Sequence, residues 1–424
     1  MMYLTERPAG RPVNQQTMKE ENLKRTFSLI REGADMTRAR LSKCAGLSAT
    51  TVSALVDELV TKGLVVEVGL AKTARSGRKP IALRVEGRSR QIPVFSLNKW
   101  GVRYTLYDLN CQALESFFVP NSTEKYGGFL GDATAPEPDA GNDYADIIES
   151  VLLREARCFD KALAPVVCVA YPGILVRPAG RFSLSGMRVS FGEASMHALE
   201  DKLGIPLFFG NASMCMGYAE KKFLDKACVP VTDMIYVNVF EGVGAGIISG
   251  GQIVTGPDHS AGEIGHVTVD YQGVSCVCGG CGCLERYVNV EEVLKNARTL
   301  ALRGELPGLL ELAGDSSDNI TLEMLDHACV SGLRAVQSLV DDVADKLFAG
   351  IYATICVTGI KRIVVGGGIE RLGARFLHRM IENATHNRDN VYLQGTTIAY
   401  AQSGSRSDSC GIAQYYMDKL FTVS

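Results

Sequence analysis

One histidine and four cysteines stand close together in residues 262–285, which read GEIGHVTVDYQGVSCVCGGCGCLE. Thiolates together with one imidazole form a ligand set that tetrahedral Zn²⁺ prefers. Glu263 and Glu285 stand near the two ends of the segment, and their carboxylates can accept hydrogen bonds from hydroxyl groups. The segment therefore predicts a structural metal and a binding site for a small polyhydroxylated ligand.

Cysteine usage along the rest of the chain favours one metal site in a reducing compartment. Four of the 13 cysteines lie within residues 276–283, and the other nine are scattered singly. A disulfide scaffold is typical of much shorter secreted chains. The N-terminal residues MMYLTERPAGRPVN contain no hydrophobic signal segment, and no apolar run approaches the roughly 18 residues of a membrane span. We therefore expect a cytoplasmic protein without a membrane partner.

Charge is distributed unevenly along the 424 residues, which are long enough for two or three domains. Residues 1–90 carry 17 Lys and Arg against 9 Asp and Glu, whereas the remainder carries 27 against 38. A basic head on an acidic body suggests that only the head contacts a polyanion. On charge alone, the alternative that the charge difference between head and body arose by chance on solvent-exposed surfaces is equally good.

The N-terminal region has the pattern of a helix-turn-helix. Apolar residues at helical spacing predict a first helix near residues 18–32. Thr37 and Ser48 are suitable N-caps for a second and a third helix, and Gly46 and Gly63 are suitable stops. The positions expected to face inward on these two helices are Leu41, Cys44, Val52, Leu55, Val56 and Leu59. Two such helices joined by a tight turn match a DNA-binding motif.

Two strand-like runs, residues 64–68 and 81–85, flank the basic segment GLAKTARSGRKP. Three helices and a hairpin with a cationic wing predict a winged helix, which we assign to residues 19–90 after a flexible tail over residues 1–18. Small polar side chains of the third helix can approach base edges, and cations of the wing can bind phosphate. The residues expected to contact DNA are Ser48, Thr50, Thr51, Ser53, Lys72, Arg75, Arg78 and Lys79. A winged helix used for protein contacts is the alternative.

From about residue 91 the pattern changes to alternating strands and helices, which is typical of an α/β protein with two lobes and a cleft. The strand-like runs are residues 92–97, 102–108, 166–170, 235–239 and 363–365. The helical runs are residues 144–159, 191–203, 322–347 and 409–420. Residues 121–142 are rich in Gly, Pro, Asp and Thr and predict a mobile surface loop.

The chain resembles the ROK family (repressors, open reading frames and kinases), in its subclass with an N-terminal winged helix. The family hallmark is G-E-x-G-H, then about ten residues, then C-x-C-G-x-x-G-C-x-E, and residues 262–266 and 276–285 fill every fixed position. Pro172-Gly173 and the glycine-rich residues 242–256 and 364–369 agree as well. The resemblance covers nearly all of the chain from residue 20 onward.

This resemblance implies a winged helix-turn-helix followed by a two-lobed, actin-like domain of the ribonuclease-H type over residues 91–424. Lobe one would comprise about residues 91–210, and lobe two about residues 211–424. The C-terminal helix would return to lobe one or support dimer contacts.

The resemblance also implies two sets of site residues. The zinc ligands would be His266, Cys276, Cys278 and Cys283. The residues that hold sugar hydroxyls would be Asn211, Glu263, His266 and Glu285. Cys281 is additional to the pattern, either as a free thiol or as a competing ligand. The alternatives are reduced cysteines without a metal, and polar side chains that only support the zinc loop.

The chain departs from family kinases where phosphoryl transfer is carried out. An aspartate follows the sugar-binding asparagine in those kinases, whereas Ala212 follows Asn211 here, so the general base is missing. The first phosphate loop resembles D-x-G-G-T in the family, but residues 96–100 read SLNKW and lack both glycines. Glu241 replaces the usual threonine of the second phosphate loop and would repel phosphate. Residues 184–187 lack an asparagine that family kinases often carry, which leaves the sugar undefined.

These features favour a transcriptional regulator, a repressor of carbohydrate genes that senses a sugar or sugar phosphate through an inactive kinase-like body and binds no ATP. Winged helices usually bind palindromic operator DNA as dimers, so we expect a homodimer or homotetramer. One alternative is an ATP-dependent sugar kinase with a DNA-binding appendage. Another is a ligand-independent repressor whose body serves dimerisation or protein docking.

Overall fold

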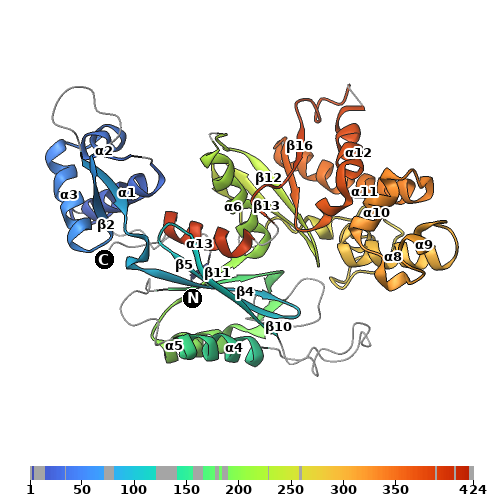
Figure 1. Ribbon diagram of the computed structural model, residues 1–424, viewed down its shortest axis with the longest axis horizontal. Coiled ribbons are helices and arrows are strands. Elements are labelled where there is room, and N and C mark those ends of the chain that lie inside the picture. Colours follow the sequence, from blue (N-terminus) through green and yellow to red (C-terminus); the bar gives the residue numbers. More distant parts are fainter. Residues whose placement is uncertain are drawn as a thin grey trace.

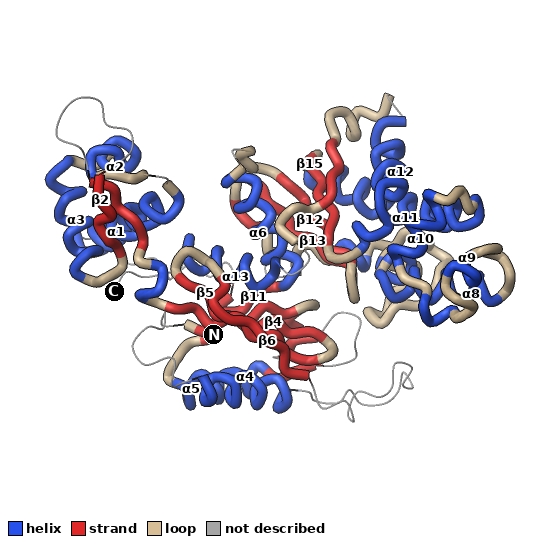
Figure 2. Tube along the Cα trace, viewed as in Figure 1, coloured by secondary structure: helices blue, strands red, loops and turns tan. Residues whose placement is uncertain are grey.

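The computed structural model describes residues 2–3, 15–33, 35–70, 81–120, 141–155, 166–176, 181–183, 190–227, 229–256, 260–386, 389–404 and 407–419. Figure 1 shows three bodies: a small helical domain at one end of the molecule and two larger lobes. Each lobe has its own sheet with helices packed against it, which Figure 2 shows in red and blue. The mixed α/β architecture predicted from the sequence is confirmed.

The small domain contains three helices and a hairpin. Its elements are α1 Gln15–Glu32, α2 Arg38–Ala45, α3 Ala49–Thr61, β2 Val65–Leu70 and β3 Ile81–Val85. Thr37 Oγ1 accepts a hydrogen bond from the Arg40 amide at 3.2 Å, and Ser48 Oγ accepts one from the Thr51 amide at 3.1 Å. Gly46 ends α2 in the left-handed conformation, with φ of 66°. These caps fix both helix starts and the tight turn as the sequence predicted.

Two expectations for this region are wrong in detail. Cys44 is exposed, and Ala45 is the residue near the end of α2 that faces the core, because it lies four positions after the buried Leu41. The segment expected as a flexible tail contains regular structure at both ends: Met2–Tyr3 forms β1, and α1 begins at Gln15. β1 pairs in parallel with β11, so main-chain hydrogen bonding adds it to the edge of a sheet.

Lobe one is built on a six-stranded sheet in the order β1-β11-β7-β4-β5-β6. Its longer strands are β4 Gln91–Asn98, β5 Gly101–Asp108, β6 Ala113–Pro120, β7 Val167–Tyr171 and β11 Leu207–Asn211. Alternate residues of a strand face opposite sides of a sheet. Val167 therefore joins the core beneath α4 (Gly141–Glu155) and α5 (Glu193–Leu203), whereas Cys168 joins the core on the other face. A small sheet of β8 Ile174–Val176, β9 Arg181–Ser183 and β10 Ser190–Gly192 precedes α5.

Lobe two is built on a five-stranded sheet in the order β14-β13-β12-β15-β16. Its strands are β12 Met234–Val239, β13 Val243–Ser249, β14 Gln252–Ile253, β15 Arg362–Gly366 and β16 Thr397–Tyr400. Its helices are α7 Glu285–Val288, α8 Val290–Leu302, α9 Leu309–Leu312, α10 Leu322–Val330, α11 Arg334–Thr358 and α12 Gly373–His386. The helix expected over residues 322–347 is two helices, because Gly332 turns the chain with φ of 83°.

Two helices lie between the sheets and connect the lobes. α6 (Ala212–Lys226) follows β11 of lobe one and leads into β12 of lobe two, and α13 (Ser407–Lys419) follows β16 and packs against α6, β4 and β7. Figure 1 shows both helices at the centre of the molecule, and α13 lies between the small domain and lobe one. Any change in the angle between the lobes must therefore involve these two helices.

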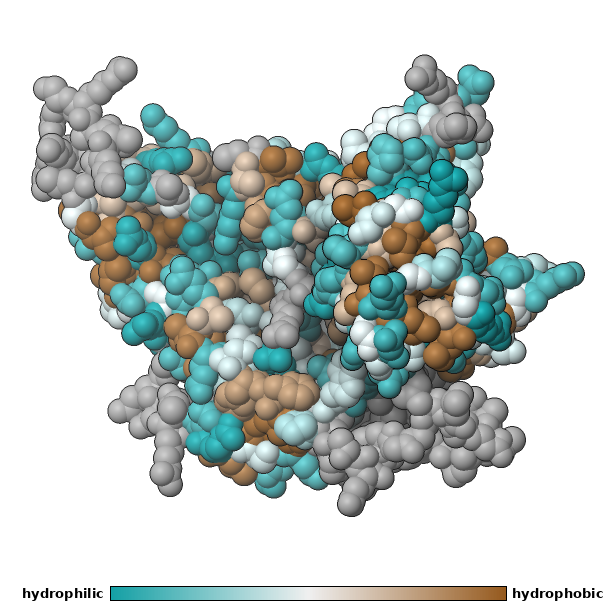
Figure 3. Space-filling view, turned by 45° about the vertical axis from the view of Figure 1, so that its right-hand side comes forward, coloured by the Kyte–Doolittle hydropathy of each residue, from teal (hydrophilic) through white to brown (hydrophobic). Residues whose placement is uncertain are grey.

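The visible surface in Figure 3 mixes hydrophilic and hydrophobic residues, with hydrophobic groups over the small domain and over lobe two. On the small domain the exposed apolar side chains include Met18, Val60, Val68 and Ile81. No helix among the described residues has the length and apolar character needed to cross a bilayer.

Candidate functional site

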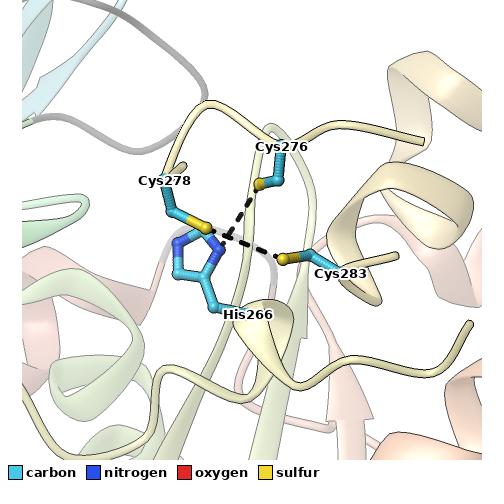
Figure 4. Close-up of side chains that lie close together, drawn as sticks. All are labelled: His266, Cys276, Cys278 and Cys283. Carbon is cyan, nitrogen blue, oxygen red and sulfur yellow. Dashed lines mark hydrogen bonds between the residues drawn. The ribbon is translucent and has the colours of Figure 1, made fainter. Parts of the chain in front are cut away.

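The four predicted zinc ligands come together in lobe two (Figure 4). His266 ends the short helix η3 (Ile264–His266), and the three cysteines come from the loop that follows. One ligand atom from each residue lies within 4.8 Å of the other three. Cys278 Sγ lies 3.6 Å from Cys283 Sγ, and Cys276 Sγ lies 3.7 Å from His266 Nδ1. Two sulfurs that share a tetrahedral zinc at about 2.3 Å are about 3.8 Å apart, so the spacing fits the metal.

The loop holds this geometry because glycines allow tight backbone contacts. The Cys276 amide donates to the Gly280 carbonyl at 2.9 Å, and the Gly279 amide donates to the Cys276 carbonyl at 3.0 Å. Gly279 and Gly282 have φ of 90° and 64°, where a side chain would be strained. A Cβ at Gly282 would also lie 1.5 Å from the Asp270 carbonyl oxygen. The glycines of the cysteine motif are therefore required by the fold of the loop.

The thiols of the cluster influence one another's protonation. Burial and the neighbouring thiols raise the pKa of Cys283 to about 12. Burial likewise raises the pKa of Cys276. For Cys278 burial acts in the same direction, but hydrogen bonds from the Gly280 amide and the neighbouring thiols lower the pKa below its ordinary value. Three thiolates cannot lie this close without a cation, and a divalent metal would supply the missing charge.

Cys281 lies outside the ligand group, although it stands between two of the ligands in sequence. Its exposed thiol donates a hydrogen bond to the Tyr271 carbonyl oxygen at 3.3 Å. The thiol is therefore directed to the backbone of the preceding loop rather than to the cluster of four ligands.

The G-E-x-G-H segment packs its backbone directly on β13. A Cβ at Gly262 would lie 2.0 Å from the Ala245 carbonyl oxygen, and a Cβ at Gly265 would lie 2.3 Å from the Val243 carbonyl oxygen. The Ala245 amide donates to the Gly262 carbonyl at 2.7 Å. Close approach of the two backbones fixes the positions of Glu263 and His266 relative to β13. Glycine is therefore required at both positions, because any side chain would collide with the backbone of β13.

The two glutamates differ in exposure, Glu263 being half-buried and Glu285 buried. Glu285 is 2% exposed, and its Oε2 accepts a hydrogen bond from the Val243 amide at 3.0 Å. Burial raises the pKa of Glu263 to about 7, and the nearby Glu285 carboxylate raises it as well. Two carboxyl groups that are close enough to affect one another can together accept and donate hydrogen bonds to a ligand with several hydroxyls.

Asn211 stands at the end of β11 and is the N-cap of α6. Its Oδ1 accepts from the amides of Ser213 at 2.9 Å and Met214 at 3.2 Å, and its Nδ2 donates to the Gly173 carbonyl at 2.7 Å. The remaining amide hydrogen has no acceptor in the described part of the chain, so it can bind a ligand. A Cβ at Gly244 would lie 2.6 Å from Ser213 Oγ and 3.9 Å from the carbonyl oxygen of Gly262, so the start of α6 adjoins the loop that carries Glu263.

The positions of the two kinase phosphate loops contact one another across the lobes. Lys99 Nζ lies 3.0 Å from Glu291 Oε2, and the Trp100 ring meets the Phe240 ring edge-on at a centroid distance of 6.4 Å. Lys99 also lies over the Trp100 ring at 4.7 Å. Burial raises the pKa of Glu241 to about 7, although Lys99 opposes that rise. The sequence indicated that the first loop had lost its glycines and that Glu241 replaced the threonine of the second, but it gave no sign that side chains from the two regions meet.

The outer face of α3 carries the predicted DNA contacts. Thr50 and Thr51 are exposed, and Ser53 is half-buried. Ser48 Oγ caps α3 and lies 2.8 Å from Thr51 Oγ1, so its hydroxyl is already engaged. The four predicted wing cations, Lys72, Arg75, Arg78 and Lys79, lie outside the described residues.

Arg38 was not predicted from the sequence to have a role, but in the structure it connects three elements of the small domain. Its guanidinium donates to the Ser53 carbonyl at 3.0 Å and lies 2.8 Å from Asp57 and 2.9 Å from Glu67. These partners come from α3 and β2, so the arginine fixes the third helix against the hairpin. Its position directly after the Thr37 cap was the only available signal, because the partners are distant in sequence.

Comparisons with known proteins agree with this geometry. A protein-family model described as the ROK family matches residues 137–418. A xylose repressor of Caldicellulosiruptor bescii is 26% identical over 369 residues, which cover 87% of this chain and 88% of that protein. The DNA-binding transcriptional dual regulator NagC of Escherichia coli is 25% identical over 363 residues, which cover 84% and 82%.

A crystal structure of a ROK family transcriptional regulator, a homologue of the Escherichia coli MLC protein, has the same fold. It gives a TM-score of 0.74 at 21% identity and covers 95% of this chain and 98% of that one. The likeness therefore includes the small N-terminal domain as well as the two lobes.

Proposed function

This chain belongs to the ROK family, and from that premise we propose that it is a sequence-specific DNA-binding repressor of carbohydrate genes. The winged helix would bind operator DNA, and the two-lobed body would bind a sugar or sugar phosphate. The observation that carries the proposal is a combination within one chain. A helix with an exposed, small polar face precedes a kinase-like body whose phosphate-loop positions contact one another.

The body would not transfer phosphate, for reasons that lie in its own side chains. Ala212 is the buried first residue of α6 and follows Asn211 directly, and its methyl group can accept no proton from a sugar hydroxyl. Lys99 and Trp100 stand where the first phosphate loop of family kinases has a glycine and a threonine, and they contact Glu291 and Phe240 instead. Glu241 adds a carboxyl group at the second loop. All three departures act against an ATP-dependent reaction.

A sugar is the class of ligand that the remaining polar groups suit. Asn211 offers an amide hydrogen, and the half-buried Glu263 and the buried Glu285 offer carboxyl groups. The names of the relatives, a xylose repressor and an N-acetylglucosamine repressor, support carbohydrate as the effector class. Binding would alter operator affinity only if the sugar favours one arrangement of the lobes over another.

His266, Cys276, Cys278 and Cys283 would hold a structural zinc ion. Four protein ligands close a tetrahedral shell, so the metal would stabilise the loop and supply no catalytic water. His266 Nδ1 faces the thiols, which leaves the Nε2 side of the ring to donate a hydrogen bond to a ligand hydroxyl. The metal would thereby fix the ring that the sugar contacts.

The test begins with operator selection from random duplex DNA by the full-length, zinc-loaded protein. We expect one palindromic sequence to be enriched, because two winged helices of a homodimer would bind its half-sites. Titration with D-xylose, N-acetyl-D-glucosamine, D-glucose and hexose 6-phosphates should identify a sugar that changes the operator Kd by about tenfold or more. No enrichment of any sequence would overturn the proposal.

Two further outcomes would assign a different function. ATP-dependent phosphorylation of any sugar in the panel would indicate a kinase that carries a DNA-binding appendage. Selective operator binding with no response to any sugar would indicate a repressor whose body serves only dimerisation or protein docking.

A further inference from the structure

Four charged side chains meet where the winged helix lies against the rest of the molecule. Two end the first helix of the winged helix, one lies on α6 and one lies on α13: Arg31, Glu32, Lys222 and Asp418. None of them belongs to the zinc ligands or to the predicted sugar-binding residues. We call this group the hinge cluster, because α6 and α13 are the helices that connect the lobes.

Asp418 is the centre of the hinge cluster. Its Oδ1 accepts a hydrogen bond from Arg31 Nη2, and its Oδ2 accepts one from the Tyr218 hydroxyl at 2.5 Å. Lys222 Nζ lies 3.0 Å from the same Oδ2 and 2.8 Å from Glu32 Oε1. The carboxylate of Asp418, on α13, thus accepts hydrogen bonds or forms ion pairs with side chains of the winged helix and of α6.

The burial of three of the four groups distinguishes them from ordinary surface ion pairs, whereas the Glu32 side chain is 48% exposed. The side chains of Arg31, Asp418 and Lys222 are 7%, 9% and 13% exposed. Surface pairs contribute little, but a buried pair is strongly sensitive to the loss of one partner, because the other charge is left without compensation. Two cations and two anions balance here. The arrangement therefore holds only while α1, α6 and α13 keep their relative positions.

Apolar packing continues across the same boundary. Phe27 and Ile30 of the winged helix belong to one hydrophobic cluster with Tyr218 of α6 and Met417 of α13. Arg31 Nη1 also lies 3.7 Å from Cys111 Sγ, in the turn between β5 and β6. The winged helix is thus packed onto the hinge and is not joined to the body only by the backbone connection that follows β3.

α6 connects the hinge cluster to the predicted sugar site. Its N-cap is Asn211, whose side chain is one of the predicted sugar contacts, and Lys222 lies eleven residues later on the same helix. At 1.5 Å per residue the two positions are about 16 Å apart along a single helix. A ligand that moves the start of α6 therefore also moves the end that holds Glu32 and Asp418.

We propose that the hinge cluster is a joint that sets the orientation of the winged helix relative to α6 and α13, and that α6 transmits ligand binding to it. Arg31 and Asp418 are thereby positioning residues for operator binding and make no contact with DNA themselves. The transmission step rests on the proposed function, whereas the joint itself does not.

The joint is tested with Asp418→Asn in the full-length, zinc-loaded protein, because asparagine keeps the shape of the side chain and removes its charge. We expect hydrogen exchange of peptides from α1 to accelerate by about tenfold, while peptides from α11 and α12 stay unchanged, because local opening is controlled by local contacts. Operator affinity should fall by about tenfold and affinity for random duplex by less than about twofold, since α3 and the wing are intact.

Asp345→Asn is the matched control. Asp345 accepts hydrogen bonds from Arg379 Nε at 2.7 Å and Nη2 at 2.8 Å between α11 and α12, far from the winged helix in sequence. We expect this substitution to accelerate exchange in α12 and to leave α1 and the operator affinity unchanged. Should Asp418→Asn fail to fold, Lys222→Met probes the same cluster from α6 and should accelerate exchange in α1 in the same way.

The outcomes separate the joint from the proposed function. Unchanged exchange in α1, or acceleration spread evenly over all peptides, overturns the joint even when operator binding is intact. Equal losses for operator and random duplex overturn its positioning role. If the wild type selects no operator, the proposed function fails, and the exchange measurements still decide whether the joint exists.

Discussion

Lys99 Nζ lies 3.0 Å from Glu291 Oε2, and this ion pair joins the turn between β4 and β5 in lobe one to the start of α8 in lobe two. The Trp100 and Phe240 rings meet beside it at a centroid distance of 6.4 Å. The carboxyl group of Glu241 is affected by both charges of the pair. Side chains at the positions that approach ATP in family kinases thus connect the two lobes directly in this chain.

Glu241→Gln should stabilise the protein increasingly as the pH rises. Burial raises the pKa of Glu241 from 4.5 to about 7 in the folded protein, so the folded state binds a proton that the unfolded chain has released. That contribution to stability is lost as the pH rises through about 7. Glutamine stays neutral, so we expect it to add on the order of 1–3 kcal/mol at pH 8.5 and much less at pH 5.5.

The measurement for Glu241 is the free energy of unfolding in urea, variant minus wild type, across that pH range. Lys99 and Glu291 are the charged groups that act on Glu241. Glu305→Gln is the matched control, because its side chain and that of its partner Arg303 are 55% and 67% exposed, and we expect its effect to stay within about 0.5 kcal/mol. A difference for Glu241→Gln that does not depend on pH would contradict the predicted protonation.

Cys278→Ser should release zinc, and Cys281→Ser should retain it. Cys278 Sγ lies within the four-ligand group, whereas Cys281 Sγ donates to the Tyr271 carbonyl. Metal binding stabilises the folded state, so loss of one ligand should lower stability by roughly 3 kcal/mol or more. Metal analysis and thermal unfolding check both variants. A wild-type protein purified without a chelator and containing no zinc would contradict the assignment.

Asn211 has a structural role and a predicted binding role that two substitutions can separate. Asn211→Ala removes the cap of α6 and should cost about 1–2 kcal/mol of stability. Asn211→Ser keeps an oxygen that can cap the helix but removes the amide donor, so it should lower stability less than Asn211→Ala. Calorimetry with the responsive sugar should give about tenfold weaker binding or worse for both variants. Wild-type affinity in the serine variant would exclude Asn211 from the ligand site.

Substitutions in α3 and in the wing should affect DNA binding in different ways. Thr51 is exposed on the outer face of α3, so Thr51→Val should change which base pairs are preferred at one position of the operator. Arg78→Ala should weaken binding to all duplexes alike and reduce the salt dependence by about one phosphate contact. Operator selection and salt titration check the two variants. If each of the two substitutions weakens binding to the operator and to random duplex equally, then α3 does not read bases as assigned.

Much of the candidate site could be predicted because it depends on short sequence distances. The caps at Thr37 and Ser48 follow from side chains that bond amides three residues later. The predicted zinc ligands follow from chemistry concentrated in one loop. The expected position of Cys44 was wrong because a helix of eight residues shows too few turns to fix which side faces the core.

The sequence by itself determined the order of elements, the grouping of His266 with the cysteines of one loop, and the presence of Ala212 and Glu241 where family kinases carry an aspartate and a threonine, because each depends on residue type at a local position. Only the tertiary structure decided which distant side chains meet. Lys99 and Glu291 are 192 residues apart, and Arg31 and Asp418 are 387 residues apart. Nothing in a local pattern encodes such pairs, since they form only when the sheets, α6 and α13 have brought separate parts of the chain together.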